Sequence, residues 1–151
     1  MTKFLLPVAG FLALNIAFLA CSPSGEEAVK KAENDVFAIH DEVMPKLDDM
    51  MRMRKKLRQR IAALDSTAAS GSASATLRTG EEQEQARRLL RDLTEADSLM
   101  MNWMTQYKND TLTKLPSAEA LRYLEQQKDK ISDVKTKINT SLAQSRQYLD
   151  K

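Results

Sequence analysis

The sequence predicts an all-α fold, an elongated up-down-up bundle of three coiled-coil-like helices whose first helix is kinked at Pro45. Apolar residues recur at spacings of three and four in three long stretches, which is the period of an amphipathic helix. No stretch alternates apolar and polar residues as a half-buried strand does. Because no helix can bury its apolar stripe alone, we expect the three to form a single domain over residues 26–150.

The first helix should begin near Glu26, because Ser24 and Glu27 have the spacing of a capping box. Its apolar stripe extends over roughly forty residues. The stripe consists of Val29, Ala32, Val36, Ile39, Val43, Leu47, Met50, Leu57, Ile61 and Leu64. Pro45 lies inside the stripe, lacks a backbone N–H and crowds the preceding turn. We therefore expect a kink just before it, or a break into two helices.

Residues 66–80 are small and polar and lose the helical period, which predicts a flexible loop. A second helix is expected over about residues 81–108, and a third over about residues 118–150. The stripe of the second helix consists of Ala86, Leu89, Leu90, Leu93, Ala96, Met100, Met104 and Tyr107. The stripe of the third consists of Leu121, Leu124, Ile131, Val134, Ile138, Leu142 and Leu149.

A histidine and several methionines lie close to Pro45 and again in the second helix. If these two helices are antiparallel and meet near residues 65 and 81, His40 and Met44 lie level with residues 102–106. An imidazole and thioethers bind soft cations such as Cu(I) and Ag(I). The candidate metal ligands are His40, Met44, Met100 and Met104. The alternative is core packing, because methionine fills irregular gaps such as the one at a proline kink.

Three aromatic residues, Trp103, Tyr107 and Tyr123, should fall near the same level of the bundle. They are candidates for a partner-binding groove, because tryptophan and tyrosine are enriched in protein interfaces. The alternative is that they pack inside the bundle, as aromatic residues at helical spacing do.

Residues 1–20 have the pattern of a bacterial lipoprotein signal peptide. Lys3 precedes an apolar run of about seventeen residues, which is short for a bilayer span. A small residue then precedes Cys21, the only cysteine, as in a lipobox, where cleavage leaves a lipid-modified cysteine at the new N-terminus. Phe18 stands where a lipobox usually has Leu, Val or Ile. Residues 21–25 would form the lipidated tether, and two or three acyl chains anchor a protein stably.

The remaining chain is nearly neutral and has no catalytic motif. Removal of residues 1–20 takes away Lys3 and no acid, so the 23 Lys and Arg fall to 22 against 21 Asp and Glu. We therefore expect no nucleic-acid partner. His40 is the only histidine, and there is no Gly-rich phosphate loop and no Ser-His-Asp set. We expect no enzyme activity and no cofactor other than the covalent lipid on Cys21.

Four segments carry a resemblance to a known group of proteins. Residues 40–46, His-Asp-Glu-Val-Met-Pro-Lys, are the most specific, and the others are residues 102–107, 123–128 and 134–139. Through them the chain is similar to small lipoproteins from Bacteroidota that are often labelled automatically as "viral A-type inclusion protein". The resemblance covers most of the chain after the signal. It implies residence in the outer membrane and a lipobox that accepts Phe18, and it implies no activity.

We expect a lipid-anchored helical bundle of the cell envelope, on the periplasmic or the surface face of the outer membrane, with a binding or scaffolding role. Its partners would be the membrane, through the N-terminal lipid, and an envelope protein or a second copy of the chain. Two alternatives stay open. One is a soft-metal protein that binds copper or silver, and the other is a periplasmic chaperone or stress factor with exposed apolar residues on its first helix.

Replacement of the lipidated cysteine tests the anchor. Cys21→Ser should block acylation, because the thiol that would form the thioether to the lipid is removed. Growth of cells with labelled palmitate measures the modification, and Ser22→Ala is the neighbouring control that should still be labelled. Uptake of palmitate by the Cys21→Ser chain would show that the lipobox interpretation is wrong.

Overall fold

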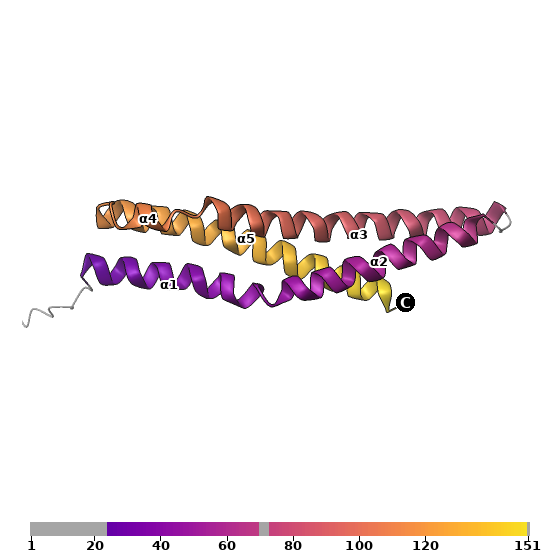
Figure 1. Ribbon diagram of the computed structural model, residues 1–151, viewed down its shortest axis with the longest axis horizontal. Helices are drawn as coiled ribbons and strands as arrows, with labels where there is room; N and C mark the ends of the chain where they lie inside the picture. Colours follow the sequence, from indigo (N-terminus) through magenta and orange to yellow (C-terminus); the bar gives the residue numbers. More distant parts are fainter. Residues whose placement is uncertain (1–23, 70–72, 151) are drawn as a thin grey trace, which may run out of the picture.

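The computed structural model describes residues 24–69 and 73–150, and this part of the chain is helical without strands (Figure 1). The helices are α1 (Gly25–Val43), α2 (Lys46–Ala68), α3 (Ala73–Gln106), α4 (Asn109–Leu112) and α5 (Ser117–Leu149). The predicted all-α class is confirmed. Among the described helices, none is both long and apolar enough to span a bilayer.

The first helix begins where the capping box predicts, within one residue. The Glu27 N–H donates to Ser24 Oγ at 3.3 Å, and the Ser24 N–H donates to Glu27 Oε2 at 3.2 Å. These bonds satisfy backbone donors that a helix start otherwise leaves unpaired. The capping box therefore stabilises the first turn of α1, next to the predicted tether.

Helical hydrogen bonding is interrupted at Met44 and Pro45, between α1 and α2. The Met44 N–H still donates to the His40 carbonyl at 3.0 Å, but proline has no N–H with which to continue the series. Two residues after the proline, the Leu47 N–H donates to the Met44 carbonyl at 3.2 Å, which spans three residues instead of four. The interruption thus follows from the missing donor of Pro45.

The connection between α2 and α3 is shorter than the loop predicted for residues 66–80. Helix covers residues 66–68 and 73–80 of that segment, so α3 begins well before the predicted start of the second helix. The reason is a seven-residue repeat of buried positions, which are Thr79, Ala86, Leu93 and Met100. Because Thr79 is polar, the apolar pattern begins only at Ala86, one repeat after the first buried position of α3.

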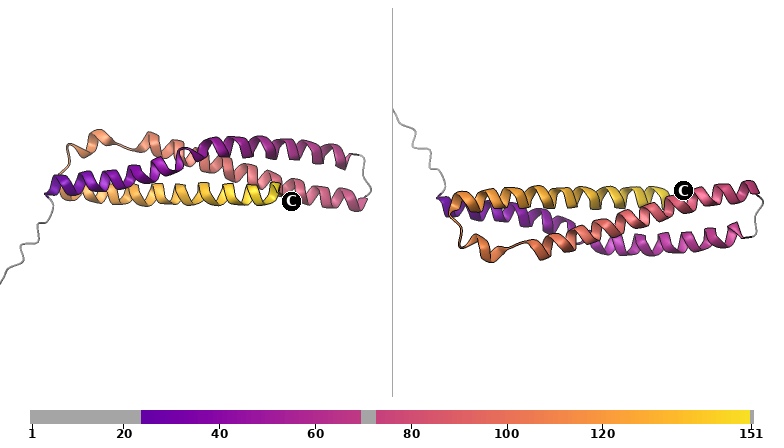
Figure 2. Two further views of the ribbon diagram at one scale, coloured as in Figure 1. Left: turned by 90° about the horizontal axis from the view of Figure 1, so that it is seen from below. Right: turned by 90° about the horizontal axis from the view of Figure 1, so that it is seen from above.

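The core forms around α5, which packs against α1, α2 and α3, while α2 also packs against α3. α5 ends before the α2–α3 connection, so the far ends of α2 and α3 lie side by side beyond it (Figure 2). The largest fully buried apolar side chains are Val36, Val43, Met50, Leu57, Leu93, Met100, Leu124, Ile131 and Ile138. All of them belong to the apolar stripes that the sequence predicts.

The core also encloses two serines of α5, Ser141 and Ser145. The hydroxyl of Ser145 is fully buried, and no described residue forms a hydrogen bond with it. Burial of an unpaired polar group costs about 1–3 kcal/mol. Ser145 therefore lowers the stability of the bundle.

Ser145→Ala should raise the free energy of unfolding by roughly 1 kcal/mol, because it removes the unpaired hydroxyl and improves helix propensity. Urea denaturation of the full chain, followed by circular dichroism, measures this change. Ser132→Ala is the matched control, because Ser132 Oγ donates to the Lys128 carbonyl at 2.7 Å and its loss should bring no such gain. A less stable Ser145→Ala chain would contradict the prediction.

Candidate functional site

An aromatic cluster joins α1, α3 and α5 in the half of the bundle that contains α1. Ring centroids are 5.2 Å apart for Phe37 and Tyr107, 5.4 Å for Trp103 and Tyr107, and 6.0 Å for Tyr107 and Tyr123. The imidazole of His40 lies 5.6 Å from the Trp103 ring. These are contact distances for aromatic rings. The predicted proximity of Trp103, Tyr107 and Tyr123 is confirmed.

Two tyrosine hydroxyls fix the end of α3 to its neighbours. The Tyr107 hydroxyl donates to Glu33 Oε1 of α1 at 3.3 Å, and the Tyr123 hydroxyl of α5 accepts from the Lys108 N–H at 2.7 Å. Partial burial, followed by the negative charge of Glu33, raises the pKa of Tyr107 well above its ordinary value. The Tyr107 hydroxyl is therefore a stable donor between α1 and α3.

Of the four predicted soft ligands, the structure brings His40 and Met104 together. His40 Nε2 lies 3.4 Å from Met104 Sδ, and His40 Nδ1 lies 2.9 Å from Asp41 Oδ1. Met100 is fully buried, and Met44 is half-buried against the core. Within the described ranges the sulfur of neither Met44 nor Met100 forms a hydrogen bond with the His40 ring. The prediction that His40 lies level with residues 102–106 is confirmed. For Met100 the alternative holds, because its side chain is packed in the core.

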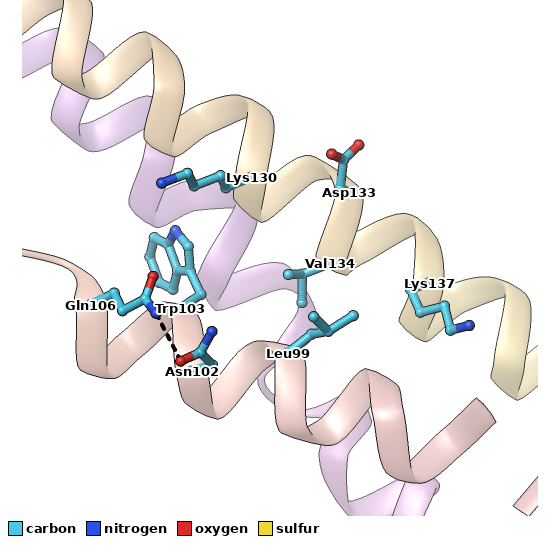
Figure 3. A pocket seen from close by; sticks show the side chains of 8 residues that line it. All are labelled: Leu99, Asn102, Trp103, Gln106, Lys130, Asp133, Val134 and Lys137. Atoms are coloured by element: carbon cyan, nitrogen blue, oxygen red, sulfur yellow. Dashed lines mark hydrogen bonds between the residues drawn. The ribbon is translucent and has the colours of Figure 1, made fainter. Parts of the chain in front are cut away.

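A groove of about 490 Å³ lies between α3 and α5, beside the aromatic cluster (Figure 3). It is lined by Leu99, Asn102, Trp103, Gln106, Lys130, Asp133, Val134 and Lys137. Leu99, Trp103 and Val134 supply its apolar surface, and the other side chains are polar. The volume falls within the range of small-ligand sites. We call this feature the α3–α5 groove.

Trp103 places an unpaired donor in the wall of this groove, where the nitrogen itself is covered. Its side chain is only 5% exposed, and no described residue accepts a hydrogen bond from Nε1. In Figure 3 the indole nitrogen is turned toward α5, on the side of Lys130. An indole N–H can only donate, so its burial without an acceptor costs about 1–3 kcal/mol. An acceptor supplied by a bound molecule would remove that cost once the side chains that cover the nitrogen move aside.

The polar side chains of the groove differ in how far they are already paired. Lys137 Nζ lies 2.8 Å from Glu95 and 3.3 Å from Asp92, and the hydrogen bond to Glu95 is the main reason that its pKa is raised. Lys130 and Asp133 are exposed and form no hydrogen bond or ion pair with any described residue. Lys130 is thus the cation of the groove that remains available to a ligand.

The sequence pattern indicates Trp103 as a candidate, but it does not indicate the groove that Trp103 lines. Leu99 lies off the predicted apolar stripe and is 38% exposed. An exposed leucine one helical turn before Trp103 was the available signal, but it is weak, since single exposed apolar residues are common. Val134 was predicted as part of a core stripe, and it is buried while also lining the groove.

The predicted lipidation site, Cys21, lies outside the described residues. Across residues 24–69 and 73–150, no group of three His, Cys, Asp or Glu side chains is arranged to hold a metal ion. No protein-family model matches the chain, and no curated protein and no solved structure matches it. Functional inference therefore rests on the geometry of the site.

Tyr107→Phe should lower the free energy of unfolding at neutral pH by about 0.5–1 kcal/mol, through loss of the hydrogen bond to Glu33. It should also reduce the loss of stability in alkali. The raised pKa keeps Tyr107 protonated in the folded chain, whereas the unfolded chain loses this proton near pH 10, so the stabilisation fades as the pH rises above about 10.

Urea denaturation at about pH 8 and pH 11 measures the difference between the wild-type and Tyr107→Phe chains. Glu33→Gln is the control, because it keeps an acceptor for the hydroxyl but removes the charge, and it should give an intermediate pH dependence. If the free energy of unfolding fell equally in the wild-type and Tyr107→Phe chains between these two pH values, Tyr107 would not contribute to the pH dependence of stability.

Proposed function

We propose that this chain is a lipid-anchored helical bundle of the bacterial cell envelope that binds a partner protein and does not catalyse a reaction. The observation that supports binding is the Trp103 indole N–H, buried beside the α3–α5 groove without an acceptor. The anchor, with its lipid on Cys21, is supported by the sequence pattern alone. Residence in the outer membrane is supported by the resemblance of the sequence.

The proposed architecture is three rods that run up, down and up. α1 and α2 would form one rod kinked at Pro45, with α3 as the second rod and α5 as the third. Two observations support this: only Met44 and Pro45 separate α1 from α2, and both helices pack against α5. The kink would allow the first rod to follow α5 in one half and α3 in the other.

This architecture would hold the groove close to the membrane. Trp103 contacts His40, which lies about 22 Å along α1 from Gly25, at 1.5 Å per residue. Cys21 precedes Gly25 by a short tether. A lipid on Cys21 would therefore place the groove within reach of the periplasmic or surface domain of a neighbouring membrane protein.

The groove also indicates the chemistry of the partner. Leu99 and Val134 favour an apolar side chain, and the Trp103 N–H requires a carbonyl or carboxylate oxygen. The unpaired charge of Lys130 favours an acidic residue next to these groups. We propose a partner segment with an apolar side chain beside a carboxylate, from an envelope protein or from a second copy of this chain.

Two lysine substitutions on α3 test the groove. Leu99 and Met101 are both exposed, at 38% and 53%, but only Leu99 lines the groove. A photo-crosslinking residue in place of Asp133, which is exposed and lines the groove, should capture a discrete protein in intact cells. Leu99→Lys should reduce this capture by about tenfold, because it places a charge on the apolar surface of the groove. Met101→Lys should leave it unchanged.

The identity of the captured protein distinguishes the two proposed partners, a second copy of the chain or another envelope protein. Circular dichroism of both variants establishes that each is folded. Capture that survives Leu99→Lys, or the absence of any protein crosslinked through position 133, would overturn the proposal that this groove binds a partner.

A chaperone role stays a prediction. The large apolar side chains that are exposed in the described ranges are Met51, Leu77, Leu99 and Met101. Only Met51 belongs to α1 or α2, whose exposed apolar residues this hypothesis requires. Suppression of client aggregation at near-stoichiometric ratios would support it.

A further inference from the structure

We propose that His40 and Met104 bind a soft monovalent cation, Cu(I) or Ag(I), beside the ring of Trp103. The site lies between α1 and α3, and it does not depend on partner binding in the α3–α5 groove. Two contacts of the His40 ring carry the inference, one from Nδ1 to Asp41 and one from Nε2 to Met104.

The contact with Asp41 determines which nitrogen of the neutral ring is protonated. Asp41 Oδ1 lies 2.9 Å from Nδ1, and an ionised carboxylate can only accept a hydrogen bond. In the neutral ring the proton is therefore on Nδ1, and Nε2 has a free lone pair. The thioether of Met104, 3.4 Å from Nε2, also offers lone pairs. A cation bound between Nε2 and Sδ would accept a lone pair from each atom.

The separation of the two donor atoms suits coordination. With the bond lengths of zinc sites, about 2.1 Å to nitrogen and 2.3 Å to sulfur, the two donor atoms lie about 3.6 Å apart at a tetrahedral angle and about 4.4 Å apart in a linear two-coordinate ion. The observed separation of Nε2 and Sδ is 3.4 Å. A two-coordinate ion therefore requires the flexible Met104 side chain to move outward by about 1 Å. The His40 side chain is 18% exposed, so an ion can enter and is then largely shielded from water.

The donor atoms and their surroundings select the class of ion. Thioether and imidazole favour soft ions, whereas hard cations such as Mg²⁺ require oxygen ligands. The centroids of the Trp103 and His40 rings are 5.6 Å apart, so an ion on Nε2 would lie near an aromatic ring, which attracts cations. A carboxylate on the other ring nitrogen orients the imidazole and fixes its tautomer, and Asp41 occupies that position.

The site needs fewer ligands than the four that the sequence suggested. Cu(I) and Ag(I) form stable complexes with two ligands, so His40 and Met104 can bind the ion while Met44 and Met100 remain packed against the core. Burial of Met100 in particular makes its sulfur part of the core.

Trp103 provides the readout, because it is the only tryptophan of the chain. The full chain, in detergent and chloride-free buffer, is titrated with silver nitrate, since Ag(I) requires no reductant. A heavy cation next to an indole ring quenches its fluorescence. We expect saturable quenching with one Ag(I) per chain, and none with Mg²⁺.

Three variants locate the ion. Met104→Leu preserves volume and apolar character, and it should weaken Ag(I) binding by about tenfold or more. His40→Ala should have a similar effect. Met51→Leu, which changes an exposed methionine of α2, is the control and should bind like the wild type. Thermal unfolding followed by circular dichroism shows whether each variant is folded.

Equal Ag(I) affinity of the wild-type and Met104→Leu chains would overturn the proposal. So would quenching of equal strength in the wild-type and His40→Ala chains. Leu99→Lys separates this site from the groove, because it should bind Ag(I) normally while it loses the crosslinked partner. Each proposal can therefore fail without the other.

Discussion

The structure depends on the burial of the apolar stripe of α5. α5 packs against α1, α2 and α3, and Leu124, Ile131 and Ile138 on its stripe are fully buried. Full burial of each such side chain contributes about 1.5–3 kcal/mol. α5 is also the main packing partner of α1. Without α5, the buried side chains of α1 would lose the surface that covers them.

This dependence on α5 explains why the candidate sites gather in one half of the bundle. There α1 and α3 both pack on α5, and they meet each other through long side chains: Phe37 with Tyr107, and His40 with Trp103 and Met104. Of these side chains, Trp103 also lines the α3–α5 groove. One arrangement of three helices therefore produces both the groove proposed to bind a partner and the nitrogen–sulfur pair proposed to bind a cation.

Two unpaired buried polar groups destabilise the bundle by similar amounts, but they differ in what they indicate about ligand binding. Ser145 Oγ and Trp103 Nε1 both lack a hydrogen-bond partner among the described residues. Ser145 is fully enclosed by the core, so no ligand can reach its hydroxyl. The Trp103 nitrogen is also covered, but its ring lines a groove with an unpaired lysine at its edge. An unpaired group indicates a binding site only where a molecule can approach it.

The sequence by itself determined the features that depend on local chemistry and helical period. These are the helices and their buried stripes, the capping box at Ser24, the interruption at Pro45 and the level at which His40 meets Met104. The start of α3 was predicted too late because buried Thr79 is polar. Only the tertiary structure showed the α3–α5 groove, the unpaired indole of Trp103 and the core position of Met100. These depend on which side chains fill the space between helices, and local periodicity does not specify how that space is filled.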